Sequence, residues 1–284
     1  MKKANSRREA PGHRPPARNF HRDRATAEPV GQTLPDGENT PPDGVVVGRG
    51  AVLELLKSGQ PVGKLYIQKG EREGSATLIA AKAIEAGIPL IEVEKDKLDR
   101  LSAGVRHQGV AALCDEKETV PLETLLQIAR DRGEAPFLVL CDGVEDPGNL
   151  GAIIRCAEGA GAHGVIIPKR RSATLTPAVY KASAGALVHM AICRVPGIPA
   201  AIDALKKEGL WIYGADMGGS PYGELDWNGP AALVLGAEGK GISRLAREKC
   251  DFIASIPMYG KVDSFNVACA AAVLLCEGAR QRNK

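Results

Sequence analysis

Between residues 45 and 113, short apolar runs alternate with segments in which apolar side chains recur every three or four positions. The runs predict strands, and the longer period predicts amphipathic helices. This alternation is typical of a small α/β domain over residues 45–117. We expect its strands at 45–47, 64–67, 90–93 and 110–113, and its helices after residue 50, over 75–86 and near 95–101.

From residue 137 the apolar runs lose their polar alternation, as in parallel strands that are buried on both faces. We therefore predict a second α/β domain, 136–284, that is built on a parallel sheet and joined to the first by a charged linker, 118–135, with one helical stretch over 122–129. Its strands are expected at 137–140, 164–167, 190–195, 210–214, 231–235 and 252–256, and its helices at 149–160, 177–187, 198–208 and 266–279.

Residues 1–44 contain almost no apolar clusters and are rich in arginine and proline. Such a segment cannot bury enough surface to offset its ordering entropy, so we predict a disordered tail. Residues 1–24 hold eight basic and two acidic side chains, a net charge of +6, so residues 25–284 sum to −3. A basic arm on an acidic body indicates contact with a polyanion, nucleic acid first. The alternative is a solvated tail with no specific role.

The seven cysteines form no CxxC pair and none lies beside a histidine at metal-ligand spacing, so we predict no metal site. Most lie in apolar runs, which indicates reduced, buried thiols in a cytoplasmic protein. The basic N-terminal segment lacks the apolar stretch of a signal peptide, and no run is long enough to span a bilayer. The cysteines are Cys114, Cys141, Cys156, Cys193, Cys250, Cys269 and Cys276.

Three polar turns of the second domain follow apolar strands, at the edge where open α/β sheets bind ligands. In the first, 142–155, either Asp146 or Asn149 could simply cap a helix. Arg155 follows among apolar residues, where a charged side chain needs a partner or an anionic ligand.

The second turn, 233–243, has three glycines in six residues around Glu238, which suggests that backbone approaches a ligand closely. An ordinary turn explains it equally well. The third, 256–266, leads into a helix of small residues, and Ser264 or Asn266 could be only its N-cap. Together the three turns favour a polar site at the mouth of the sheet.

Two other nucleotide-binding patterns are absent or misplaced. The segment 159–164 fits GxGxxG by letter but follows a helix and precedes a strand, whereas a dinucleotide fingerprint must follow a strand and open a helix. The chain also contains no GxxxxGK[ST]. A nicotinamide-dependent oxidoreductase and a phosphate-loop ATPase are therefore disfavoured.

Three segments together resemble the motifs of the SpoU (TrmH) family of RNA 2′-O-methyltransferases, in the SPOUT superfamily. They are DGVEDPGNLGAIIR, LVLGAEGKGIS and IPMYGKVDSFNVACAAAVLLCE, and their order and separation match as well. VGRGAVLELLKSG, KLYIQKG and VRHQGVAAL are similar to the substrate-binding domain of the subgroup that methylates a guanosine of 23S ribosomal RNA. The resemblance covers about residues 45–282.

The resemblance implies a fold that spacing cannot show: a parallel-sheet α/β domain whose C-terminal segment forms a deep trefoil knot. It also implies a homodimer that packs through the C-terminal helix, and S-adenosyl-methionine held by backbone near Gly236, Ile256 and Phe265. Two positions depart from the family pattern. Family members commonly carry leucine in place of Phe265, and often carry glutamate and proline within 185–191.

By the same resemblance Arg155 is the catalytic arginine. A guanidinium stays protonated, so we favour a role in stabilising the developing alkoxide or gripping a phosphate that takes the proton. Asn149 and Asn266 would orient ribose and cofactor. Glu238 would hold Arg155 or the target base, and Ser264 would donate to the site.

The chemistry implies RNA as the partner rather than DNA or membrane, because only RNA carries the 2′-hydroxyl. The first domain favours ribosomal RNA, and transfer RNA is the alternative within the family. A non-catalytic RNA-binding protein of ribosome assembly is a further alternative, which the intact set of motif residues disfavours.

Overall fold

The computed structural model describes residues 44–71, 74–114 and 117–283. The predicted tail 1–44 lies outside this part of the chain, except for Gly44. The described residues form two sheets, of four and six strands, each with its own helices.

The four-stranded sheet has the order β1-β4-β2-β3 and is mixed. β4 runs antiparallel to β1 and β2, whereas β2 and β3 are parallel. The predicted alternation of strands and helices is confirmed here. The elements are β1 (Val45–Val47), α1 (Arg49–Lys57), β2 (Val62–Gln68), α2 (Ser75–Glu85), β3 (Leu90–Val93), α3 (Lys95–Ser102) and β4 (Val110–Cys114).

Both faces of this small sheet are covered. α1 and α2 bury Leu55 and Ile79 against one face, together with Leu65 of β2. α3 buries Leu98 against the other face, where Val47 and Ala111 lie. Successive side chains of β1 and β4 point to opposite faces of the sheet, so these strands contribute to an apolar core on each face.

The six-stranded sheet has the order β10-β8-β9-β5-β6-β7, and all its strand pairs are parallel. The predicted parallel sheet is therefore confirmed. Its strands are β5 (Phe137–Asp142), β6 (Gly164–Pro168), β7 (Ile192–Val195), β8 (Trp211–Pro221), β9 (Ala231–Gly236) and β10 (Phe252–Ser255). Its helices are α4 (Leu122–Asp131), α5 (Pro147–Gly159), α6 (Pro177–Ala182), α7 (Ala186–His189), α8 (Ile198–Lys207), α9 (Arg244–Lys249) and α10 (Val267–Arg282).

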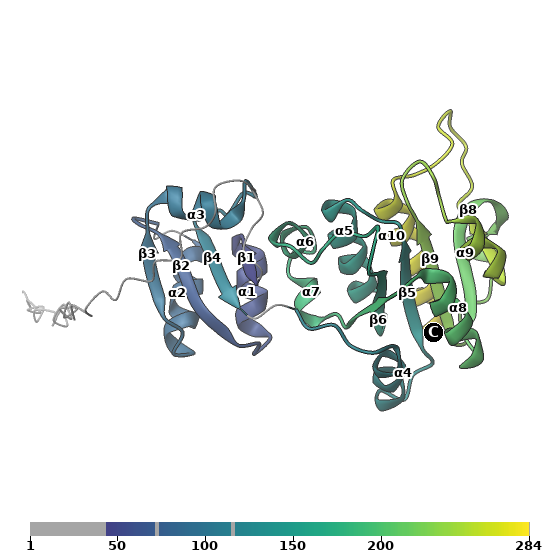
Figure 1. The fold of residues 1–284 in the computed structure, drawn as a ribbon, viewed down its shortest axis with the longest axis horizontal. Coiled ribbons are helices and arrows are strands. Elements are labelled where there is room, and N and C mark those ends of the chain that lie inside the picture. Colours follow the sequence, from purple (N-terminus) through teal and green to yellow (C-terminus); the bar gives the residue numbers. More distant parts are fainter. Residues whose placement is uncertain (1–43, 72–73, 115–116, 284) are drawn as a thin grey trace, which may run out of the picture. The chain divides into compact units, whose positions relative to one another are not determined.

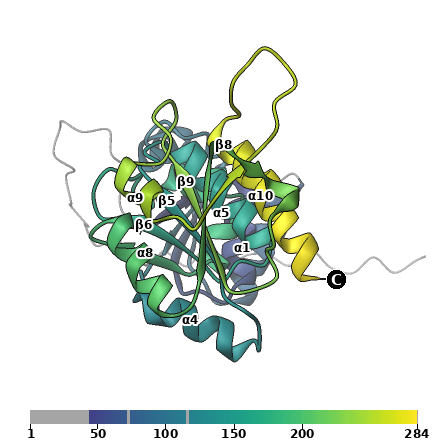
Figure 2. The same cartoon turned by 90° about the vertical axis from the view of Figure 1, so that its right-hand side faces the viewer.

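Helices cover both faces of the large sheet. Figure 2 shows α5 and α10 on one side of the strands and α4, α8 and α9 on the other. Successive residues of β5 alternate between the two layers: Val139 faces the core with α5 and α10, and Leu138 and Leu140 face the core with α8. The segment predicted as a linker contains α4, whose Leu125 and Leu126 are buried in that second core.

The helix predicted over 177–187 is wrong, because the chain breaks it into α6 and α7. Ala184 and Gly185 both adopt left-handed backbone angles, with φ of 51° and 94°. Two consecutive positive φ values end a right-handed helix. The Ser183 hydroxyl caps the break by donating to the Tyr180 carbonyl.

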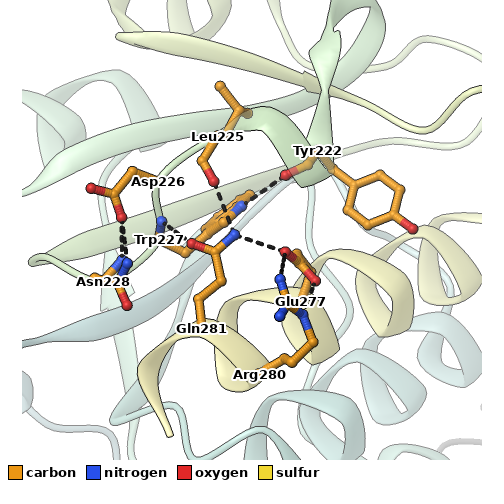
Figure 3. Close-up of polar contacts among 8 residues, drawn as sticks. All are labelled: Tyr222, Leu225, Asp226, Trp227, Asn228, Glu277, Arg280 and Gln281. Atoms are coloured by element: carbon orange, nitrogen blue, oxygen red, sulfur yellow. Dashed lines mark hydrogen bonds and ion pairs between the residues drawn. The ribbon is translucent and has the colours of Figure 1, made fainter. Parts of the chain in front are cut away.

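The last helix, α10, is fastened to the segment between β8 and β9 (Figure 3). The Gln281 amide donates to the Leu225 carbonyl at 3.0 Å, and its oxygen accepts from the Trp227 backbone N–H at 3.0 Å. The Trp227 indole N–H donates to the Tyr222 carbonyl, which holds the loop in a turn. Glu277 accepts from both Gln281 and Arg280.

The end of α10 is held more tightly still. The Arg282 guanidinium donates to four backbone carbonyls and lies 4.8 Å from the centre of the Phe137 ring. Burial lowers the pKa of Arg282, and this cost is offset by the hydrogen bonds. The four carbonyls belong to Ala135, Pro136, Trp227 and Gly229.

The cysteine prediction is only partly right. Cys114, Cys141 and Cys193 are buried, but Cys269 and Cys276 are exposed on α10. The small residues Ala268, Ala271 and Gly278 of the same helix are buried, so Cys269 and Cys276 lie on its other face. Within the described residues, no helix is long and apolar enough to cross a membrane.

Candidate active site

The three predicted turns follow β5, β9 and β10 at the carboxyl edge of the large sheet, in which β5 and β9 lie side by side (Figure 1). β5 and β9 are direct neighbours, with Asp142 opposite Gly236. Parallel strands bring their carboxyl ends to one edge, so turns far apart in the sequence become neighbours. The Asp142 carboxylate confirms this contact by accepting a 2.8 Å hydrogen bond from the Ser243 backbone N–H.

Asn266 joins all three turns through one side chain. Its amide nitrogen donates to the Asn149 side-chain oxygen at 2.9 Å and to the Glu238 carboxylate. Its oxygen accepts from the backbone N–H of Ala268 and Cys269, and so caps α10. The N-cap interpretation of Asn266 is correct but incomplete, because the same amide also connects the motifs.

The first turn uses Asp146 as its helix cap. The Asp146 carboxylate accepts from the Asn149 backbone N–H at 2.7 Å, and Pro147 occupies the first helical position. The Asn149 side chain is therefore left for the contact with Asn266. Of the two residues that could have capped α5, the structure selects Asp146.

A cavity of about 480 Å³ lies beside this junction. That volume lies within the range of small-molecule sites, about 300–1,000 Å³. Six predicted residues line it, all from the second and third turns. They are Gly236, Glu238, Ile256, Ser264, Phe265 and Asn266.

The glycines of the second turn serve the fold of the turn itself. The chain doubles back so that Ala237 and Gly241 exchange two backbone hydrogen bonds, of 3.0 and 2.8 Å. A Cβ on Gly236 would lie 2.1 Å from the backbone of Gly241. Gly239 and Gly241 adopt positive φ. A tight turn therefore requires these glycines, and it leaves backbone groups to line the cavity.

The lining of the cavity is suited to a cationic ligand with polar groups. Three carboxylates line it, from Asp216, Glu238 and Asp263, and Lys240 adds one basic group. Carboxylates attract a positively charged group and accept hydrogen bonds from hydroxyls. The sulfonium, ammonium and ribose groups of S-adenosyl-methionine fit these donors and acceptors, and its carboxylate fits Lys240.

Asp216 was not predicted from the sequence. β8 pairs with β10 on both sides of an excursion: Gly214 is opposite Ile253, and the next pair joins Ser220 to Ala254. The extra residues bring Asp216 to the cavity, where Arg247 donates to its carboxylate at 2.8 Å. The only local signal of this bulge in the sequence is the pair Gly218-Gly219, since glycine within a strand often marks a bulge.

Arg155 differs from its prediction in one respect. Its neighbours Ile153 and Ile154 are buried, but Arg155 is exposed on the outer side of α5. Within the described residues it forms no hydrogen bond or ion pair, and Glu238 bonds to Asn266 instead. Arg155 is not a lining residue of the cavity. Its guanidinium is therefore available to an anionic ligand that reaches the site from outside.

The thiol of Cys141, at the end of the strand that leads into the first turn, is not a candidate nucleophile. Cys141 lies in β5 one residue before Asp142 and is fully buried. Burial, together with the neighbouring Asp142 charge, raises the pKa of the Cys141 thiol to about 12. A thiol with this pKa stays protonated at neutral pH and has a packing role.

A second cavity, of about 560 Å³, lies in the small domain between α1, α3 and the turn before β4. Most of its charged groups bind one another: Arg49 pairs with Glu71 at 2.8 Å, and Asp99 contacts both Lys95 and His107. Arg106 also lines this cavity, and among the described residues it forms no ion pair.

Known proteins match both domains. Residues 136–276 match the model of the SpoU rRNA Methylase family, and residues 45–120 match the model described as RNA 2′-O ribose methyltransferase substrate binding. The fold and the cavity thus define a class, the S-adenosyl-methionine-dependent RNA methyltransferases.

Curated relatives agree over most of the chain. The TrmH family tRNA/rRNA methyltransferase YacO of Bacillus subtilis (strain 168) is 41% identical over 239 residues, 84% of this chain and 96% of YacO. A TrmH family tRNA/rRNA methyltransferase of Staphylococcus haemolyticus (strain JCSC1435) is 42% identical over 243 residues, 85% of this chain and 97% of that protein.

Solved structures agree as well. The SpoU methyltransferase AviRb of Streptomyces viridochromogenes, in complex with AdoMet, matches with a TM-score of 0.69 and 27% identity, over 84% of this chain and 90% of AviRb. An AdoMet-bound rRNA methyltransferase of Sinorhizobium meliloti matches with a TM-score of 0.67 and 26% identity, over 83% and 86% of the two chains. The chain belongs to the SpoU (TrmH) family of RNA methyltransferases.

Proposed function

We propose that this methyltransferase acts on a ribose 2′-hydroxyl of RNA, and that its target is a guanosine of 23S ribosomal RNA. The observation that carries the proposal is the junction made by Asn266, which links Asn149 and Glu238 beside a cavity suited to the cofactor. The match of residues 45–120 to a 2′-O ribose substrate-binding model supports the ribose as the methylated group.

The cofactor supplies an electrophilic methyl group on a sulfonium. The backbone around Gly236, Ile256 and Phe265 would hold it, with the Asp216 carboxylate accepting from hydroxyl or ammonium groups. The Asp216–Arg247 ion pair fixes the direction of that carboxylate. The larger Phe265 ring is about half exposed, so it can cover the adenine without changing a main-chain contact.

The attacking hydroxyl is a poor nucleophile until its proton leaves. Arg155 carries a permanent positive charge with five donors, so it would stabilise the developing alkoxide or bind the adjacent phosphate. Asn149 and Asn266 would orient the ribose, because their amides are already fixed by one another at 2.9 Å. Ser264 is exposed at the cavity rim, where its hydroxyl can donate to substrate or cofactor.

Transfer RNA is the second candidate substrate. The curated relatives carry both RNA classes in their descriptions, so those descriptions favour neither. The match of residues 136–276 to a family model named for rRNA methylases and the rRNA methyltransferase of S. meliloti support ribosomal RNA. We also keep the cytoplasmic location as a prediction that follows from an RNA substrate.

The family resemblance further supports a trefoil knot and a homodimer. The exposed face of α10, which carries Cys269 and Cys276, is the surface that a second copy would cover. Its small side chains allow a close approach of two helices, in agreement with that proposal.

The deciding experiment is methyl transfer from labelled S-adenosyl-methionine to total RNA from a strain that lacks this gene, followed by separation of the RNA by size and analysis of the labelled nucleoside. Label on a ribose of 23S RNA would support the proposal. Label in the transfer RNA fraction would show that the substrate is transfer RNA instead of ribosomal RNA. Label on a base would overturn the 2′-O chemistry. Cofactor binding without transfer would favour the non-catalytic alternative.

A further inference from the structure

The loop that follows β6 carries three consecutive basic residues, Lys169, Arg170 and Arg171, at the same edge of the sheet as the candidate active site. All three are exposed. In the described part of the chain, none of them lies within ion-pair distance of a carboxylate. Other cations of this domain, such as Lys249 and Arg244, are paired with acidic neighbours.

The loop is attached directly to the first turn of the site. The Ala173 backbone N–H donates to the Val144 carbonyl at 3.0 Å, and both residues are buried. At its other end, the Lys169 N–H donates to the Val195 carbonyl at 2.8 Å, which extends the pairing of β6 with β7. The three basic residues are therefore held at both ends and stand beside the turn that contains Asn149.

One residue of the loop is kept in a strained conformation. Arg171 adopts a left-handed backbone with φ of 56°, which residues with a Cβ rarely do. Glycine would adopt this conformation at lower cost. A charged residue that is held in a strained conformation beside a site is an observation that points to function.

The charges around the cavity show why such a loop is needed. The turns facing the site contribute Glu145, Asp146 and Glu238, and Asp263 and Asp216 line the cavity, so that the acidic side chains outnumber the basic Lys240 and Lys261 of the same turns. This acidic surface suits a cationic cofactor but repels a polyanion. An RNA strand that reaches the site needs basic groups to hold its phosphates nearby.

We propose that Lys169, Arg170 and Arg171 form a clamp for the RNA backbone, which binds phosphates next to the nucleotide whose ribose enters the site. This inference rests on the proposed function and adds the surface that holds the substrate. The clamp binds phosphate, so it adds affinity without reading sequence. The acidic cavity would thus bind the cationic cofactor, and the basic loop would bind the anionic RNA.

The test combines Arg170→Ala with Arg171→Gly in the full-length chain. Binding of a 20-nucleotide single-stranded RNA of mixed sequence is measured by fluorescence anisotropy over a range of salt concentrations. We expect weaker binding, and a plot of log Kd against log salt that is shallower by about 0.7 for each phosphate that the loop no longer binds. In methyl transfer to total RNA, the KM for RNA should rise severalfold while kcat at saturating RNA is retained.

The matched control removes two charges from the opposite edge of the same domain, by Arg132→Ala with Lys207→Ala, at the ends of α4 and α8. Both residues are exposed. This control should retain the native salt slope, and both double variants should bind S-adenosyl-homocysteine as the native protein does. Arg171→Gly alone should unfold at the native temperature or above, because it relieves the backbone while it weakens RNA binding.

Equal loss of affinity in the loop variant and the control would overturn the clamp, because only net charge would then matter. Native affinity and slope in the loop variant would overturn it as well. If the native protein labels RNA in the transfer assay, these outcomes leave the proposed function intact. If the native protein neither binds nor labels RNA, the proposed function fails and the clamp fails with it.

Discussion

The polar side chains at the two edges of the six-stranded sheet differ in how many hydrogen bonds they form within the protein. At the edge where the strands begin, Arg282 donates to four carbonyls, and the buried ring of His163 binds both Phe137 and Glu134. On α5, the helix that begins at the carboxyl edge, Arg155 is exposed and forms no ion pair or side-chain hydrogen bond with the described residues. A saturated polar group stabilises the fold, whereas an unsatisfied one at a sheet mouth is available to a ligand.

The largest expected effect tests the unpaired arginine. Arg155→Ala should lower kcat by about 10²–10³, the range for the loss of one donor to a developing oxyanion. Affinity for S-adenosyl-homocysteine and the urea midpoint should stay native, since Arg155 is exposed and forms no ion pair or side-chain hydrogen bond with the described residues. Single-turnover methyl transfer together with calorimetric binding measures both quantities. A native kcat would remove Arg155 from the mechanism.

The paired arginine should show the opposite behaviour. Arg282→Ala leaves four carbonyls without their donor, so the free energy of unfolding should fall by about 2–4 kcal/mol. The kcat per folded molecule should change little, because Arg282 lies at the far end of α10. Urea unfolding measures the loss. Arg282→Lys is the control, since it retains the charge but cannot reach all four carbonyls.

The Asn266 side chain both stabilises the fold, by capping α10, and links the motifs of the site, through Asn149 and Glu238. Two substitutions separate these roles. Asn266→Ser retains an oxygen that can cap α10 but loses the amide that binds Asn149 and Glu238. We expect nearly native stability with reduced turnover. Asn266→Ala loses the cap as well and should cost about 1 kcal/mol more in unfolding free energy. If Asn266→Ser is as active as the native protein, the junction of the motifs has no role in turnover.

The smallest effect concerns pH at the saturated edge. Burial lowers the pKa of His163 from its ordinary value of 6.5, although the hydrogen bond to Glu134 opposes this shift. Below pH 6.5 the unfolded chain therefore binds a proton that the folded chain resists. The contribution of His163 to stability is complete above pH 6.5 and is lost as the pH falls toward the lower folded value.

His163→Asn should flatten this dependence, because the amide oxygen can still accept from the Phe137 N–H but does not titrate. Urea unfolding of both proteins at several values between about pH 8 and pH 5 measures the difference in slope. Parallel curves would show that His163 does not control the acid sensitivity.

Much of the fold was predictable from the chain because apolar runs without polar alternation are a direct mark of buried parallel strands. All six predicted strands of the second domain form, with ends that differ by one or two residues except in β8. There the prediction stopped at Gly214, whereas the strand resumes pairing at Ser220 after a bulge. Pairing partners across a bulge are set by the neighbouring strand and cannot be inferred from local pattern.

The positions of the motifs in the fold could be predicted from the sequence. The hydrogen-bond partners of their side chains could not, because several partners are possible for each. The turns around Asn149, Glu238 and Asn266 were predicted to meet, and they do. The choice of Asp146 as the cap and of Asn266 as the partner of Glu238 depends on three-dimensional geometry. Local pattern does not mark the basic loop at 169–171 as part of the site, because its attachment to Val144 joins segments that are distant in the sequence.

The strand order of the large sheet also determines how late in synthesis its centre can form. β5 pairs with β9, so Phe137 can pair with Ala231 only after about a hundred further residues have been synthesised. Such long-range pairing is slow, and a nascent chain emerges from its N-terminal end. The first turn of the site is therefore synthesised early, and Asn266 can bind Asn149 only after the start of α10 has been synthesised. Catalytic competence is then a late event of biosynthesis, and a folding intermediate without α10 has neither the junction nor the cap that secures it.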